Sequence, residues 1–143
     1  MLVVARKISK RLQSIHASGS KLLTIIYRLF SVGSRSHQSE VMKTYTSRLQ
    51  EKFSILHVTS KGSSLKICLV AEGKVDLYPR FGLTSEWYTA AAHAILVAAG
   101  GSIIDFDCNE LTYNSKGSYL NPYFCAVSSI ENLGKILIKY DNK

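Results

Sequence analysis

The sequence predicts an α/β fold, in which short buried strands alternate with longer helices. From Ser34 onward, short apolar stretches alternate with longer stretches of helical periodicity. The stretch Glu86–Ala99 is apolar on nearly every side, which predicts a helix buried between two layers. Of the 143 residues, 46% are hydrophobic and 20% are charged. This composition is typical of a globular domain and argues against disorder.

The first predicted elements lead from a basic segment into the α/β pattern. Lys21–Phe30 could form a basic amphipathic helix. Ser39–Lys52 is predicted to be a helix with Ser39 as its N-cap, because apolar residues recur on one face at helical spacing. Phe53–Val58 predicts a strand. A glycine-led turn then precedes a short buried helix, Leu65–Ala71.

The later elements are separated by proline and glycine signals. Val75–Tyr78 predicts a strand that ends at Pro79, since proline cannot donate to a sheet ladder. Glu86–Ala99 is the apolar helix, which the glycines after it bring to an end. The remaining predicted elements are three strands and a closing helix, at Ser102–Phe106, Leu111–Tyr113, Phe124–Ser128 and Ile130–Tyr140.

The net charge of +8 is concentrated at one end of the chain. Residues 1–39 hold seven basic residues and no acid, whereas residues 40–143 hold eleven basic and ten acidic residues. The body therefore lacks the basic stripe expected of a nucleic-acid-binding domain, and we expect no nucleic acid polymer as a partner. We divide the chain into a basic leader of uncertain structure, residues 1–33, and a domain, residues 34–143. A solvated leader is favoured over one that lies on an anionic membrane surface.

The number and spacing of the cysteines indicate the cellular compartment of the chain. Cys68, Cys108 and Cys125 are odd in number and widely spaced, so we expect free thiols. Free thiols favour a reducing environment and predict a cytoplasmic location.

Three places put phosphate-suited groups at the ends of predicted elements, where open α/β sheets usually bind ligands. Ser34–His37 offers hydroxyls, a guanidinium and an imidazole in one loop. Gly62–Lys66 begins a helix whose N–H groups can receive an anion, with Lys66 on the same side as Ser63. Arg80 follows a strand, where its guanidinium could face a phosphate. Surface solvation or ordinary capping would also explain each of these alone.

Five strings taken together resemble the CysQ-type 3'(2'),5'-bisphosphate nucleotidases of the inositol monophosphatase superfamily. They occur in the order and rough spacing of that family, at Ser34–His37, Gly62–Cys68, Asp76–Gly82, Glu86–Ala91 and Asn121–Pro122. The resemblance implies the carboxyl-terminal half of the inositol-monophosphatase-like sugar phosphatase fold, with a mixed sheet flanked by helices.

The resemblance also implies an activity and a ligand site. Enzymes of this family remove a phosphate from 3'-phosphoadenosine 5'-phosphate to give AMP, with magnesium ions. The matching positions imply that His37, Ser63, Lys66 and Arg80 contact the nucleotide. A phosphorylated adenosine nucleotide is therefore the expected small-molecule partner.

The chain departs from the family at its metal ligands. The family has Trp-Asp where this chain has Trp87-Tyr88, and a neutral phenol cannot replace the carboxylate that holds magnesium. No acid precedes Glu40, and the family's Asp-Pro motif is absent. We therefore expect no metal ligand, no bound magnesium and no phosphatase activity from this chain alone. A nucleotide-binding subunit, one half of a split enzyme and the remnant of an inositol-phosphate phosphatase remain open, with an amino-terminal half or a second copy covering an exposed apolar face.

Other ionisable residues favour structural interpretations. His57 lies in a predicted strand and His93 in the apolar helix, so both are expected to pack rather than to catalyse. Asp105, Asp107 and Glu110 lie at a strand-to-turn junction, where solvated acids are common.

Overall fold

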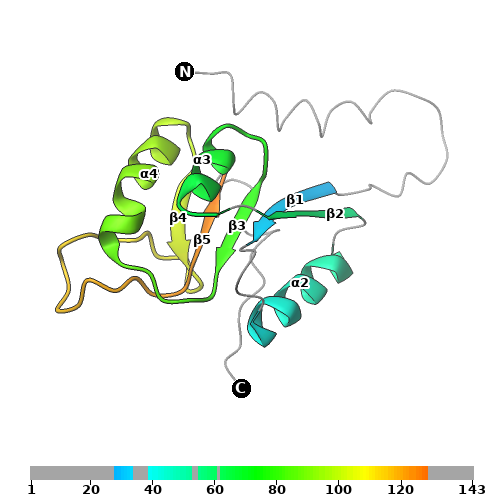
Figure 1. The fold of residues 1–143 in the computed structure, drawn as a ribbon, viewed down its shortest axis with the longest axis horizontal. Helices are drawn as coiled ribbons and strands as arrows, with labels where there is room; N and C mark the ends of the chain where they lie inside the picture. Colours follow the sequence, from blue (N-terminus) through cyan, green and yellow to red (C-terminus); the bar gives the residue numbers. More distant parts are fainter. Residues whose placement is uncertain (1–27, 34–38, 53–54, 61, 129–143) are drawn as a thin grey trace.

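The structure, a computed structural model, describes residues 28–33, 39–52, 55–60 and 62–128. These residues form a five-stranded sheet with helices on both of its faces (Figure 1). In chain order the elements are β1 Arg28–Gly33, α2 Glu40–Lys52, β2 Ile55–Ser60, α3 Leu65–Ala71, β3 Leu77–Arg80, α4 Glu86–Ala98, β4 Ser102–Asp105 and β5 Phe124–Val127. The predicted α/β class is confirmed.

The sheet has the order β2-β1-β3-β5-β4 and is mixed, as predicted. β1 runs parallel to β2 and to β3, whereas β5 runs antiparallel to both β3 and β4. Successive strand residues point to opposite faces, so the sheet separates two cores. One core joins the sheet to α3 and α4, and the other joins it to α2. The strand residues of the first core include Tyr78, Ile103, Phe124 and Ala126, and those of the second are Leu77, Ile104, Cys125 and Val127.

The helices predicted from periodicity form close to their expected bounds. The Met42 N–H donates to Ser39 Oγ at 3.3 Å, which confirms Ser39 as the N-cap of α2. α3 has the predicted bounds, and Gly73 beyond its end has a φ of 67°, a left-handed conformation that glycine adopts without strain. Local sequence signals were therefore sufficient for these helices.

Two strand predictions are wrong. β3 continues through Pro79 to Arg80. A strand that is hydrogen-bonded to one neighbour uses the N–H groups of alternate residues only, so a proline can lie at a position whose N–H is not used. β1 is paired with β3 only at Leu77, so no partner there requires a donor from Pro79. The segment Leu111–Tyr113 is not a strand: the Leu111 N–H donates to the Ile103 carbonyl at 3.1 Å, but ladder pairing is limited to an isolated bridge at Glu110.

Two helix predictions also need correction. Arg28–Phe30, the end of the predicted basic helix, is part of β1, because these residues find a parallel partner in β2. The helix α4 was predicted to be buried between layers, but it packs on the sheet with one side only. Ile130–Tyr140 lies outside the described residues. Within the described residues, no helix is long and apolar enough to cross a membrane.

Candidate functional site

The site is built around Lys66, a lysine near the start of α3 whose side chain is buried. Only 2% of Lys66 is exposed. Its Nζ donates to the Ser63 carbonyl at 2.9 Å and lies 5.1 Å from the centre of the Tyr78 ring. Ser63 has a φ of 58°, so the turn before α3 is held in a left-handed conformation that presents this carbonyl to the amine. The amine is thus fixed between a backbone turn and an aromatic face.

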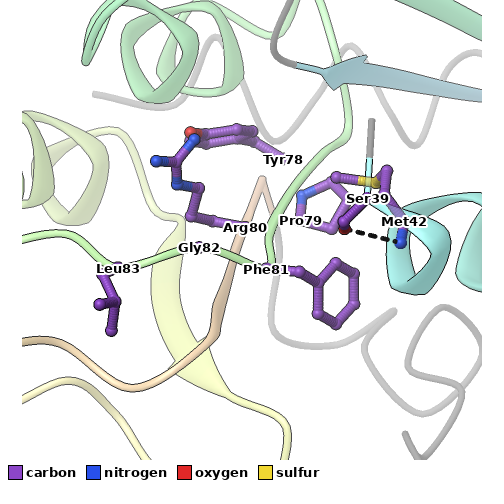
Figure 2. Close-up of a pocket in the computed structure, with 8 residues that line it drawn as sticks. All are labelled: Ser39, Met42, Tyr78, Pro79, Arg80, Phe81, Gly82 and Leu83. Atoms are coloured by element: carbon purple, nitrogen blue, oxygen red, sulfur yellow. Dashed lines mark hydrogen bonds between the residues drawn. The ribbon is translucent and has the colours of Figure 1, made fainter. Parts of the chain in front are cut away.

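Arg80 approaches the same tyrosine from the end of β3. Residues 78 and 80 of a strand point to the same face, and Figure 2 shows the Arg80 guanidinium beside the hydroxyl end of Tyr78. Arg80 Nε is buried and makes no hydrogen bond within the described part of the chain. The end of β3 borders a cavity of about 300 Å³, lined by Ser39, Met42, Tyr78, Pro79, Arg80, Phe81, Gly82 and Leu83.

The positive charges of Lys66 and Arg80 lie close enough to repel each other. Burial lowers the pKa of Lys66, and the nearby Arg80 guanidinium lowers it further. Burial raises the pKa of Tyr78 to about 12, although the Arg80 guanidinium opposes this increase. Two positive charges held close together in a partly desolvated place favour the binding of an anion. A phosphate would have both a planar guanidinium and an amine available to it.

The structure brings together three of the four predicted ligand residues. Ser63, Lys66 and Arg80 converge around Tyr78, whereas His37 lies outside the described residues, as does the rest of Ser34–His37. Sequence reasoning missed Tyr78 as a member of the site. Its position two residues before Arg80 in a strand was the available signal, because alternation places both side chains on one face.

Tyr88, where the resemblance predicts a lost metal ligand, lies in the first turn of α4. Tyr88 also raises the pKa of Tyr78, the ring that Lys66 and Arg80 approach. Among the residues that the structure describes, no three His, Cys, Asp or Glu side chains gather where they could hold a metal ion. The Asp105 carboxylate instead accepts hydrogen bonds from the backbone of Asp107 and Asn109, at 2.9 and 2.8 Å. The described part of the chain therefore does not fit magnesium.

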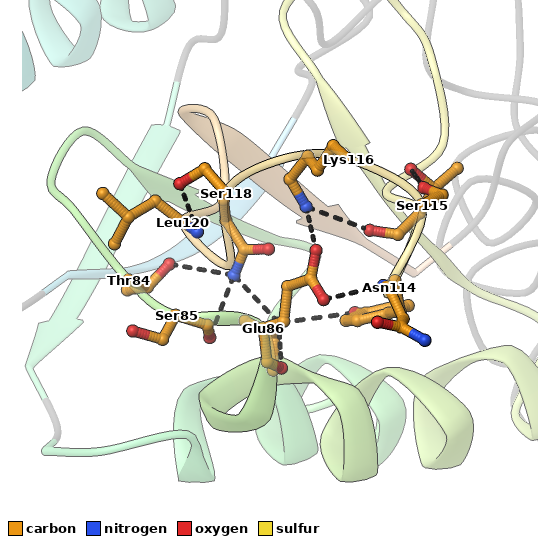
Figure 3. A network of polar contacts seen from close by, with 12 residues as sticks. Thr84, Ser85, Glu86, Asn114, Ser115, Lys116, Ser118 and Leu120 are labelled. Atoms are coloured by element: carbon orange, nitrogen blue, oxygen red, sulfur yellow. Dashed lines mark hydrogen bonds and ion pairs between the residues drawn. The ribbon is translucent and has the colours of Figure 1, made fainter.

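The start of α4 is fixed by a polar junction with the loop before β5 (Figure 3). The Glu86 carboxylate pairs with Lys116 and accepts the Asn114 N–H at 2.8 Å, and these bonds lower the pKa of Glu86. Asn121 Nδ2 donates to Thr89 Oγ1 at 3.0 Å and also to the segment before the helix. Glu86 and Asn121 are buried, so this junction holds the first turn of α4 in place.

His93 has a packing role, as predicted. Its Nδ1 lies 2.8 Å from the Tyr113 hydroxyl, and its Nε2 accepts the Ile103 N–H at 3.4 Å. Burial lowers the pKa of His93, while Glu110 acts in the opposite direction. Both ring nitrogens are occupied by structural contacts.

Comparison with known proteins places this α/β unit among the phosphatase folds. The sequence profile of the inositol monophosphatase family matches residues 6–135. The chain belongs to the inositol monophosphatase family.

Individual relatives show which members of the inositol monophosphatase family this chain is similar to. The chain is 52% identical over 91 residues to the 3'(2'),5'-bisphosphate nucleotidase CysQ of Salmonella typhimurium, a match that covers 64% of this chain and 35% of that protein. It is 52% identical over 75 residues to an uncharacterized protein in the pss 5' region of Rhizobium leguminosarum, covering 49% of this chain and 79% of that protein. The crystal structure of CysQ from Bacteroides thetaiotaomicron superimposes with a TM-score of 0.64 and 39% identity, over 87% of this chain and 44% of that one.

These matches confirm the expected family and fold. They also show that the chain spans about a third of the length of the curated CysQ relative and less than half of the crystallised one.

Proposed function

We propose that this chain binds a bisphosphorylated adenosine nucleotide through Lys66 and Arg80, and that it does not hydrolyse the nucleotide by itself. The observation that carries the proposal is the convergence of both cations on Tyr78 beside a cavity. The similarity to proteins named 3'(2'),5'-bisphosphate nucleotidase supports the ligand class.

The positive charges of Lys66 and Arg80 favour a phosphate as the group that binds. Lys66 is buried among apolar residues and lies near a second cation, so its charged form is disfavoured in the free protein. A phosphate placed between Lys66 and Arg80 would replace this repulsion with two charge-assisted interactions. A second phosphate on the ligand adds charge that AMP lacks, and the bisphosphate should therefore bind more tightly than AMP.

The chemical step requires groups that the described residues do not supply. The family resemblance implies hydrolysis by a water molecule activated on magnesium, and that reaction requires carboxylate ligands. Tyr88 replaces one of these, and no cluster of ligands is present among the described residues. We infer that catalysis needs the part of the family fold that this chain does not span, which makes one half of a split enzyme the second candidate function. Cys68, Cys108 and Cys125 are all free thiols, which supports our placing the chain in the cytoplasm.

Calorimetric titration with 3'-phosphoadenosine 5'-phosphate tests the binding. We expect heat of binding, a weaker affinity for AMP, and a loss of about tenfold or more in affinity for Arg80→Ala, because a charged hydrogen-bonding partner is removed. Lys74→Ala is the control, since Lys74 is exposed and pairs with Glu72 away from the site. Absence of heat at millimolar nucleotide, or equal losses for the two variants, would overturn the proposal.

A further inference from the structure

The Arg80 guanidinium lies flat against the backbone of Gly82, two residues further along the chain. A Cβ at residue 82 would lie 3.4 Å from both Cζ and Nη2 of Arg80 and 3.5 Å from its Nε. Gly73 and Gly100 have positive φ values, whereas Gly82 does not, so the backbone there would accept other residues. What the glycine provides at this position is therefore space for the guanidinium.

The backbone on either side of Gly82 is held in place. The Phe81 ring is stacked on that of Phe106, with 4.7 Å between the ring centres. On the other side, the Thr84 carbonyl accepts the Asn121 N–H at 2.8 Å. A bulky side chain at residue 82 would therefore displace the guanidinium, which ends a flexible side chain, more readily than it would displace the backbone.

The guanidinium is placed by packing and not by a carboxylate. The Tyr78 hydroxyl lies beside it (Figure 2). Because an arginine side chain has donors only, the buried Tyr78 O–H and the buried Arg80 Nε–H both lack an acceptor among the described residues. The ion pairs of the described residues do not include Arg80. A carboxylate would fix the guanidinium but neutralise it, whereas a glycine leaves its charge for a ligand.

We propose that Gly82 is a positioning residue, because the absence of a side chain at residue 82 keeps the Arg80 guanidinium beside Tyr78 and near Lys66. A phosphate that meets Lys66 then also meets the guanidinium. The use of this arrangement by a phosphate rests on the proposed nucleotide binding, but the placement of the guanidinium does not.

Substitutions of graded size separate the space at residue 82 from other effects. In Gly82→Ala the added atom meets the guanidinium at an ordinary van der Waals distance, so Arg80 should stay where it is. Gly82→Val and Gly82→Leu, two bulky variants of different shape, should displace it. Gly117→Val is the control, since nothing lies within 4 Å of a Cβ at that position. Circular dichroism checks that each variant is folded.

The pKa of Lys66 reports the position of the guanidinium without any ligand. The guanidinium lowers this pKa, so Arg80→Ala should raise it toward its ordinary value. The two bulky variants should raise it by the same amount, and Gly82→Ala and Gly117→Val should leave it unchanged. Titration of the lysine ε-carbon signals by NMR measures the effect, with Lys66→Met identifying the signal. An unchanged pKa in the bulky variants, or in Arg80→Ala, would overturn the proposal.

Calorimetric titration with 3'-phosphoadenosine 5'-phosphate tests the use of this position in binding. Gly82→Val should weaken the affinity by about tenfold or more, as Arg80→Ala does. In an Arg80→Ala background, Gly82→Val should cause no further loss, because both changes act on one group. An equal further loss in that background would contradict a positioning role. If the unaltered chain gives no heat, the proposed function is wrong, and the Lys66 titration alone decides whether Gly82 places the guanidinium.

Discussion

The Lys66 amine lies over the face of the Tyr78 ring, 5.1 Å from its centre, in a side chain that is 2% exposed. This placement costs stability, because burial and the Arg80 guanidinium both disfavour the charged amine. A buried cation with a lowered pKa beside a second cation is a candidate ligand-binding group.

Replacing Lys66 should therefore raise stability while it removes ligand binding. Lys66→Met keeps the length of the side chain and removes the charge, and we expect stabilisation of about 1 kcal/mol, or a Tm higher by roughly 3–6 °C. The nucleotide should no longer shift Tm. Differential scanning fluorimetry with and without 3'-phosphoadenosine 5'-phosphate measures both effects, with Lys74→Met as the control. A lower Tm without ligand would show that the bond to the Ser63 carbonyl outweighs the burial of the charge.

Acidification should destabilise the fold through His93. Its pKa is lowered in the folded chain, so between that lowered value and the ordinary value near 6.5 the unfolded chain binds more protons. The free energy of unfolding should therefore decrease as the pH falls from about 7.5 to about 5.5. His93→Gln can still accept the Ile103 N–H, and it should flatten this dependence. Urea unfolding at several pH values gives the slope, and an unchanged slope in His93→Gln would contradict the assignment.

The elements that could be predicted from the sequence are those fixed by local signals. α2 and α3 follow from apolar periodicity, the Ser39 cap and the glycine beyond Ala71. β3 was predicted to end before Pro79 because proline removes a donor, but whether that donor is needed depends on which strand lies beside it. The burial of α4 was predicted incorrectly for a similar reason, since a sequence pattern does not show which layers of the fold the chain contains.

The candidate site was predictable in part. Lys66 and Arg80 are cations at element ends within strings that resemble a phosphatase family, and the structure brings them together. Tyr78 could not be identified as their common neighbour from chemistry alone, because its contact with Lys66 depends on how α3 packs on β3. The order of helices and strands along the chain does not specify the angle at which α3 packs on β3.

Gly101 is expected to be intolerant of any side chain. A Cβ at this position would lie 2.4 Å from the Val127 carbonyl oxygen and 2.5 Å from Leu96 Cδ1. Gly101→Ala should destabilise the chain by about 2 kcal/mol or more, because backbone of β5 would have to move. Gly117→Ala is the matched control, since nothing lies within 4 Å of the added atom. Thermal unfolding of both variants tests this, and equal Tm values would contradict the close approach.

Substitutions of Tyr88 test both the expected loss of catalysis and the electrostatics around Lys66 and Arg80. The family resemblance implies aspartate at this position, in the first turn of α4, where a carboxylate would also interact favourably with the helix dipole. Tyr88→Asp should therefore fold. Because Tyr88 lies near Tyr78, the new carboxylate would also lie near Lys66 and Arg80 and compete for their charge.

In the absence of magnesium, Tyr88→Asp should thus weaken nucleotide binding by about tenfold, whereas the neutral Tyr88→Asn should not. Neither variant should release phosphate alone, since a single carboxylate does not complete a magnesium site. When the part of a CysQ protein that this chain lacks is added with magnesium, Tyr88→Asp should gain phosphatase activity, and the wild type and Tyr88→Asn should remain inactive. Phosphate release by the unaltered chain alone would show that its ligands lie outside the described residues, and equal nucleotide affinity in both variants would show that Tyr88 lies too far from the cations to affect them.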